Sequence, residues 1–126
     1  MFAVILASNA NESTLPEFEC TAIEVKDHLR DEKIFGKSPY PFFSLRRYVS
    51  GDWNFRAGKN SFQIKSNEVL KTTPIASSKA IYEVPYGDGS ILRFELIGTS
   101  PSRNGNMVRV KSPPMETRVL AKLTCY

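Results

Sequence analysis

The two cysteines of this chain, Cys20 and Cys125, lie near opposite ends of its 126 residues. A disulfide between them would close almost the whole chain, because it requires Cα atoms within about 7 Å of each other. Loop closure of this size stabilises a fold by roughly 4–5 kcal/mol. Two free, buried cysteines in a cytosolic protein are the alternative. A cysteine pair in an exported chain is most often a disulfide, which we therefore expect.

The first ten residues bear on the compartment in which that bond would form. An apolar run, 2–7, precedes Ser8 and Ala10, which fit the small-x-small pattern of a signal-peptidase site. A basic region is missing, as it would be if the true start lay upstream. We expect 1–10 to be a signal-peptide remnant and 11–126 to be a single β domain. The other interpretation is a buried strand, "FAVIL". No transmembrane segment is expected, because about 18 apolar residues are needed to span a bilayer.

Short strands separated by turns are the main pattern in the rest of the chain. Eight prolines and seven glycines are spread along it, which favours short strands over long helices. In "ILRFELI", 91–97, apolar and charged residues alternate as in a half-buried strand. Asp88-Gly89 predicts a hairpin turn before this strand, and Asn104-Gly105 predicts another after it.

Both cysteines lie on the apolar faces of predicted strands. Cys20 shares a face with Phe18, and Cys125 shares one with Val119. An antiparallel barrel whose terminal strands meet would join the sulfurs and remove exposed sheet edges. The predicted fold class is therefore all-β: a small antiparallel β-barrel or sandwich closed by a terminal disulfide. One short helix is allowed near 26–34.

Aromatic and basic residues concentrate in the stretch 40–59. The candidate binding residues there are Tyr40, Phe43, Arg46, Arg47, Tyr48, Trp53 and Arg56. Rings beside arginines occur at protein interfaces and on single-stranded nucleic-acid platforms. The simpler interpretation is that the rings are the core and rim of a small barrel and that the arginines are its solvated face. The net charge of +4 is too small to favour a nucleic-acid partner.

Catalytic and metal-binding patterns are weak. His28 is the one histidine, and no serine or cysteine follows a nucleophile motif such as G-x-S-x-G. Two cysteines and one histidine supply too few ligands for zinc in any known spacing. We therefore expect a solvated surface histidine, no enzyme activity, no metal and no cofactor.

These expectations lead to two functional hypotheses. The first is an exported protein, periplasmic or secreted, that acts as a β-barrel-like binding module. It would present the aromatic and basic stretch to a protein, an envelope polymer or a small ligand. The second is an inhibitor or immunity-type protein that blocks an envelope enzyme, because small rigid scaffolds bind with little ordering cost. A projecting loop at 38–43 or 98–106 would favour the second.

Overall fold

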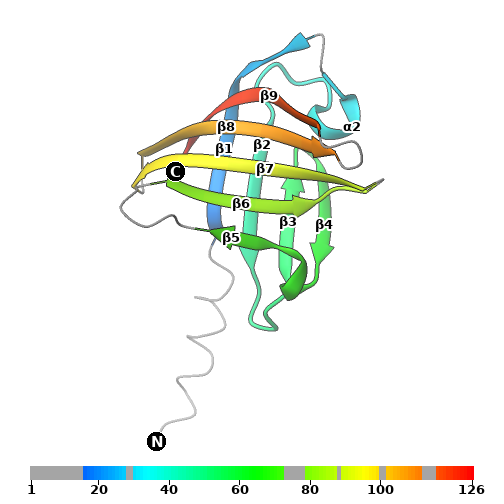
Figure 1. Cartoon of the computed structure of the whole chain (residues 1–126), viewed down its shortest axis with the longest axis vertical. Helices are drawn as coiled ribbons and strands as arrows, with labels where there is room; N and C mark the ends of the chain where they lie inside the picture. Colours follow the sequence, from blue (N-terminus) through cyan, green and yellow to red (C-terminus); the bar gives the residue numbers. More distant parts are fainter. Residues whose placement is uncertain (1–15, 28–29, 73–78, 88, 100–101, 112–115) are drawn as a thin grey trace, which may run out of the picture.

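The described strands form one antiparallel sheet of nine strands that curls into a half-barrel (Figure 1). The computed structural model describes residues 16–27, 30–72, 79–87, 89–99, 102–111 and 116–126. The predicted all-β class, with a disulfide between the ends, is confirmed. The strands are β1 (Pro16–Val25), β2 (Phe42–Arg47), β3 (Trp53–Ala57), β4 (Asn60–Ile64), β5 (Leu70–Thr72), β6 (Lys79–Pro85), β7 (Ser90–Thr99), β8 (Ser102–Lys111) and β9 (Glu116–Cys125).

The strand order places the chain ends in the middle of the sheet and leaves β4 and β5 at its two edges. The order is β4-β3-β2-β1-β9-β8-β7-β6-β5, and all neighbours are antiparallel. Because β9 also runs antiparallel to β1, strands β4 and β5 run in the same sense. The 3-10 turn η2 (Ser66–Glu68) joins them as a corner, so the chain passes from one half of the sheet to the other.

A cluster of phenylalanines packs the two halves of the sheet against each other. In Figure 1, β5–β8 cross the front of β1–β4. Phe94 of β7 is fully buried and lies close to rings from three strands of the opposite half. The distances between ring centroids are 4.8 Å to Phe18, 5.9 Å to Phe43 and 5.7 Å to Phe55. Burial of such large rings is the main source of stability in a domain of this size.

The helix expected near 26–34 is a single turn, α2 (Glu32–Phe35). Asp31 caps it by accepting a hydrogen bond from the backbone N–H of Lys33 at 2.8 Å. Ile34 and Phe35 are buried against the barrel, with the Phe35 ring 5.9 Å from the ring of Phe43. These contacts place α2 over one end of the half-barrel (Figure 1).

The two predicted turns have different outcomes. The hairpin around Asp88-Gly89 is confirmed, since β6 and β7 pair up to Pro85 and Ile91, although Asp88 itself lies outside the described residues. The turn predicted at Asn104-Gly105 is wrong. Strands β7 and β8 stay paired as far as Thr99 and Ser102, so both residues lie inside β8.

A bulge in β9 also corrects the predicted inward face of the last strand. The pairing of β8 with β9 shifts between Met107 and Val108, which leaves Leu120 as an extra residue. Leu120 is therefore buried, at 3% exposed, whereas Val119 turns outward at 37% exposed. The prediction that Val119 shares the face of Cys125 is wrong for this reason.

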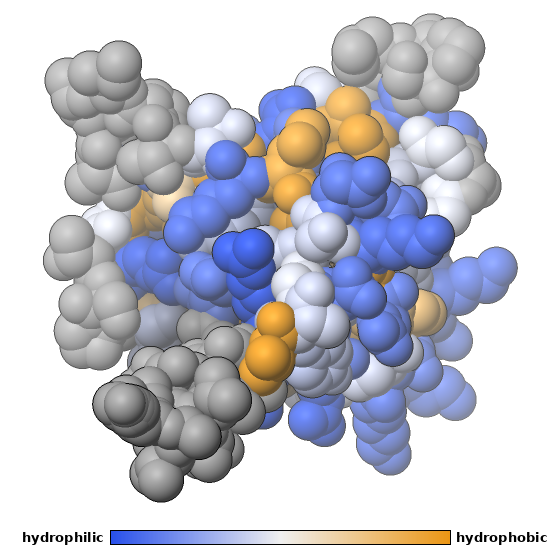
Figure 2. All heavy atoms as spheres, turned by 90° about the horizontal axis from the view of Figure 1, so that it is seen from below, coloured by the Kyte–Doolittle hydropathy of each residue, from blue (hydrophilic) through white to orange (hydrophobic). Residues whose placement is uncertain are grey.

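The described part of the face seen from below is mainly hydrophilic (Figure 2). In Figure 2, the visible apolar side chains form small separate patches among polar residues. Scattered exposed apolar residues are normal on a folded domain. Positions 1–10, with the predicted signal remnant and the alternative strand, lie outside the described residues. None of the described helices is long and apolar enough to cross a membrane.

Candidate functional site

Two of the predicted binding residues lie in the core. Phe43 of β2 is 0% exposed, and Trp53 of β3 is 6% exposed. Their assignment to an exposed binding surface is wrong, because strand alternation directs Phe43 and Leu45 inward while Ser44 pairs with the outward-facing Arg56. For these two rings, the interpretation as barrel core is correct.

The other predicted residues are exposed or half-buried, and each cation among them is engaged by a neighbouring residue. Arg46 pairs with Glu19 at 3.7 Å, and Arg56 Nε donates to the carbonyl of Gly58 at 3.0 Å. Arg47 lies over the Trp53 ring, 5.6 Å from its centroid. Tyr40, which is 65% exposed, lies before β2, and the half-buried Tyr48 lies after it. The stretch 40–59 therefore divides between the core and the outside of the β2–β3 hairpin, with Arg46 and Arg56 on its outer face.

A pocket of about 470 Å³ opens elsewhere, between β4 and the end of β6. We call this opening the seam pocket. Phe62 of β4 and Tyr86, which follows β6, meet edge to face across it, with ring centroids 6.2 Å apart. Eight residues line the seam pocket: Lys33, Phe55, Asn60, Phe62, Ile64, Pro85, Tyr86 and Gly87.

The seam pocket is part of the inner side of the half-barrel. Phe62 pairs directly with Phe55 of β3, which is 1% exposed and points into the core. Asn60, Phe62 and Ile64 alternate along β4 and so share this inner face. The pocket therefore continues into the aromatic core, and Phe62, at 42% exposed, lies at its mouth.

Pro85 removes one backbone donor from the side of β6 that faces away from β7. The backbone N–H of Tyr86 donates to the carbonyl of Ser90 on β7 at 2.9 Å. Backbone groups alternate sides along a strand, so position 85 directs its nitrogen away from β7, toward the open side. A proline has no N–H to donate there. Strand β6 pairs with β5 through Ile81 and Glu83 and with no described residue of β4.

The single-turn helix α2 holds Lys33 at the rim of the seam pocket. Its cap residue, Asp31, also pairs with Arg109 of β8 at 3.7 Å. Arg30 donates to the carbonyl of Gly36 at 2.8 Å and lies 5.8 Å from the centre of the Phe35 ring. With Phe35 buried, the backbone that carries Lys33 is fixed on both sides.

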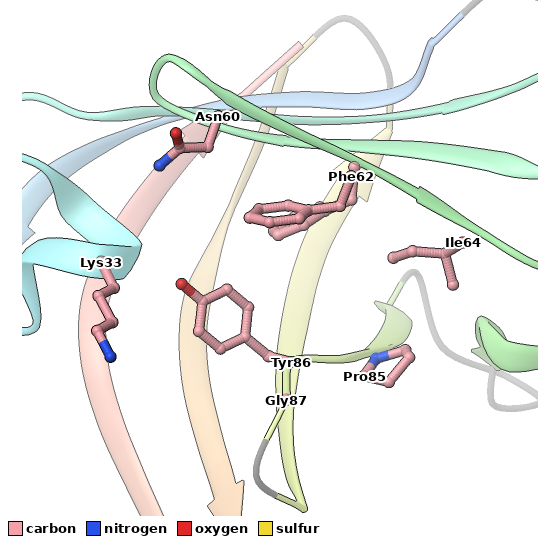
Figure 3. A pocket seen from close by; sticks show the side chains of 8 residues that line it. Lys33, Asn60, Phe62, Ile64, Pro85, Tyr86 and Gly87 are labelled. Carbon is pink, nitrogen blue, oxygen red and sulfur yellow. The ribbon is translucent and has the colours of Figure 1, made fainter.

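The polar and apolar groups of the seam pocket lie at different ends. In Figure 3, Lys33, Asn60 and the hydroxyl end of the Tyr86 ring lie on the side of α2. Ile64 and Pro85 lie at the other end, with the Phe62 ring between. Such an arrangement can hold an apolar molecule and orient it through one polar end.

Sequence reasoning missed Lys33, Asn60 and Tyr86 as site residues. Phe62 and Ile64 lie two positions apart in β4, so strand alternation alone puts them on one face. Nothing in the local sequence shows that this face lies opposite Tyr86, because their contact depends on the curl of the whole sheet. Among the described residues, no group of three His, Cys, Asp or Glu side chains could hold a metal ion, and His28 lies outside the described residues.

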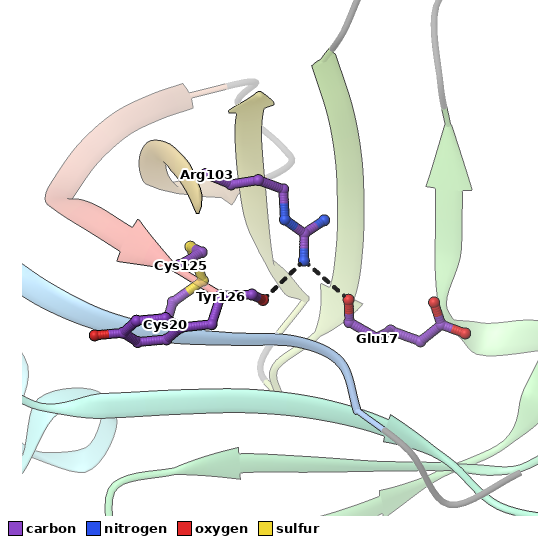
Figure 4. The surroundings of a disulfide bond; sticks show 5 residues. All are labelled: Glu17, Cys20, Arg103, Cys125 and Tyr126. Atoms are coloured by element: carbon purple, nitrogen blue, oxygen red, sulfur yellow. Dashed lines mark hydrogen bonds between the residues drawn. A yellow bond between two sulfur atoms is a disulfide. The ribbon is translucent and has the colours of Figure 1, made fainter. Parts of the chain in front are cut away.

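The disulfide lies in a separate region from the seam pocket. Cys20 and Cys125 are directly paired on β1 and β9, with their Cα atoms 4.0 Å apart, and both are buried. Beside them, Arg103 Nη2 donates to the carbonyls of Glu17 at 3.1 Å and Tyr126 at 3.2 Å (Figure 4). The predicted disulfide is confirmed, and Arg103 adds a second link between the first strand and the chain end.

The comparisons with known proteins leave the fold and the seam pocket as the basis for assigning function. No protein-family model matches the chain, and no curated protein or solved structure is significantly similar to it. By its structure, the protein belongs to the class of small, disulfide-linked antiparallel half-barrels.

Proposed function

We propose that this protein is an exported binding module that takes a small, largely apolar molecule into the seam pocket. The observation that carries the proposal is the pocket of about 470 Å³ between β4 and β6. Its size falls within the range of about 300–1,000 Å³ typical of small-molecule sites, which also favour the mouths of β-barrels. The proposal moves the binding site from the exposed stretch 40–59 to the open side of the barrel.

The rings of the seam pocket support an apolar ligand. Phe55 is held by the core, and the rings of Phe62 and Tyr86 contact each other edge to face, with their centroids 6.2 Å apart. Rings that are held by such contacts lose little conformational freedom when a ligand binds. An aromatic or aliphatic body that lies against these rings would bury apolar area.

The disulfide supports export to the periplasm or to the outside of the cell. Structural disulfides persist in oxidising compartments and are rare in the cytosol. Cys20 and Cys125 are joined and buried, which is typical of a structural bond. Mass spectrometry of the natively produced protein, alkylated without reductant, should find no modified cysteine. Two alkylated thiols would contradict export to an oxidising compartment.

Binding can be tested with the neutral fluorescent probe N-phenyl-1-naphthylamine, which brightens in apolar surroundings. We expect saturable binding that weakens about tenfold in Phe62→Ala, because an aromatic contact contributes about 1–1.5 kcal/mol. The matched control is Tyr40→Ala, which removes a ring that is 65% exposed and does not line the pocket. If Tyr40→Ala weakens binding and Phe62→Ala does not, the site is the exposed stretch and the proposal is wrong.

The inhibitor or immunity-type alternative has less support. It was expected to use a loop projecting at 38–43 or 98–106. Most of 98–106 belongs to β7 and β8, and Phe42 and Phe43 already belong to β2. Tyr40 is the exposed aromatic residue that such a function could still use.

A further inference from the structure

We infer that the ligand of the seam pocket is an amphipathic anion, with an apolar body and one carboxylate, sulfonate or similar group that meets Lys33. This inference rests on the proposed function of the same pocket. The body would lie between Phe62 and Ile64, and the acidic group would lie on the side of α2 (Figure 3).

The charge of the lining is the first argument. Among the described residues that line the seam pocket, Lys33 is the one that carries a charge, and none is a carboxylate. The carboxylate of Asp31, which lies just before α2, has other partners. It accepts a hydrogen bond from the backbone N–H of Lys33 and forms an ion pair with Arg109. The Lys33 ammonium forms no ion pair with any residue in the described parts of the chain. A ligand anion would supply that partner.

The division of the pocket is the second argument. Asn60 and the hydroxyl end of Tyr86 lie on the same side as Lys33, whereas Pro85 and Ile64 lie on the other (Figure 3). An apolar molecule with an acidic group at one end matches this division. A fully apolar molecule would place no acceptor beside the Lys33 ammonium, and polar groups that lose water without gaining hydrogen bonds weaken binding.

The expected size of the effect is modest, because Lys33 is exposed at the rim. Ion pairs in such positions are screened by water and salt. We therefore expect the anionic group to improve affinity about fivefold at low salt. The gain should shrink as salt rises, while binding of the apolar body should not weaken.

The test compares two probes that share the same rings. 1-Anilinonaphthalene-8-sulfonate carries a sulfonate, whereas N-phenyl-1-naphthylamine is neutral. We expect Lys33→Gln to weaken the sulfonate probe about fivefold and to leave the neutral probe within twofold. Lys37→Gln is the matched control, because Lys37 is an exposed lysine close to α2 that does not line the pocket. Circular dichroism confirms that each variant is folded.

The outcomes separate this inference from the proposed function. If the neutral probe binds and depends on Phe62, but the sulfonate probe is indifferent to Lys33→Gln, only the preference for anions is overturned. If neither probe binds, the seam-pocket function fails and the inference fails with it. Salt titration of the unmodified protein gives a second measurement: sulfonate binding that is as insensitive to salt as neutral binding also overturns the preference.

Discussion

Reduction of the Cys20–Cys125 bond should remove a large part of the protein's stability. The two residues are 105 positions apart, so the bond closes most of the chain into a loop. The loop-closure relation, about 2.1 + 1.5R ln n cal/mol/K, gives about 4.7 kcal/mol at 25 °C for a loop of this length. A domain of this size has a free energy of unfolding of about 5–15 kcal/mol. The reduced protein should therefore be folded but marginal.

Equilibrium unfolding in urea, with and without reductant, measures this effect. For an m-value of about 2 kcal/mol/M, the loss lowers the unfolding midpoint by about 2 M. The double variant Cys20→Ala/Cys125→Ala is the control, because its midpoint should not respond to reductant. A shift below about 0.5 M in the unmodified protein would refute the reasoning. It would mean that the terminal strands stay together in the unfolded state without the bond.

Two further predictions concern packing. A Cβ at position 105 would lie 1.9 Å from the carbonyl oxygen of Glu95, so Gly105→Ala should force β7 and β8 apart and lower the free energy of unfolding by about 3 kcal/mol or more. The control Asn104→Ala changes an exposed residue and should alter the thermal midpoint little. Equal midpoints for the two variants would contradict the close approach. Phe94→Ala should lower the free energy of unfolding, measured with denaturant, by about 3–5 kcal/mol because it leaves a cavity among three rings. Phe62→Ala removes a ring at the pocket mouth and should lower it clearly less. The reverse order would place the core elsewhere.

Local patterns were sufficient for the strands and the disulfide. Alternation in 91–97 predicts β7 directly, because a strand buried on one face repeats every two residues. The positions of Cys20 and Cys125 on apolar faces near the chain ends predict their pairing. The strand depends on residues that are neighbours in sequence, and the disulfide depends on the first and last strands lying side by side.

The same turn signature gave opposite results because strand pairing decides between turn and strand. Asn104 and Gly105 tolerate turn conformations, but β7 continues to Thr99 and offers partners for both: Ile97 pairs with Asn104, and Leu96 pairs with Gly105. Each added pair contributes backbone hydrogen bonds that a turn at 104–105 would forgo. The glycine is needed there for close approach, which sequence alone does not distinguish from a need for turning.

The aromatic stretch was misread for a related reason. Sequence density shows that rings and arginines are near each other along the chain, but a strand sends successive residues to opposite faces. Phe43 and Trp53 thus enter the core while Arg46 and Arg56 remain outside. The seam pocket needs residues from α2, β4 and the end of β6, and only the curled sheet brings these together.

The disulfide and the seam pocket lie in different parts of the sheet, and a final prediction follows from this separation. The disulfide and Arg103 link β1 to β9 in the middle of the sheet order, whereas the seam pocket lies beside β4, at an edge. Neither Cys20, Cys125 nor Arg103 lines the pocket. Effects at sites that share no contacts are generally independent. Protein that is reduced but still folded should therefore bind N-phenyl-1-naphthylamine within about twofold of the oxidised affinity. A larger loss, with circular dichroism unchanged, would show that the terminal bond also shapes the pocket.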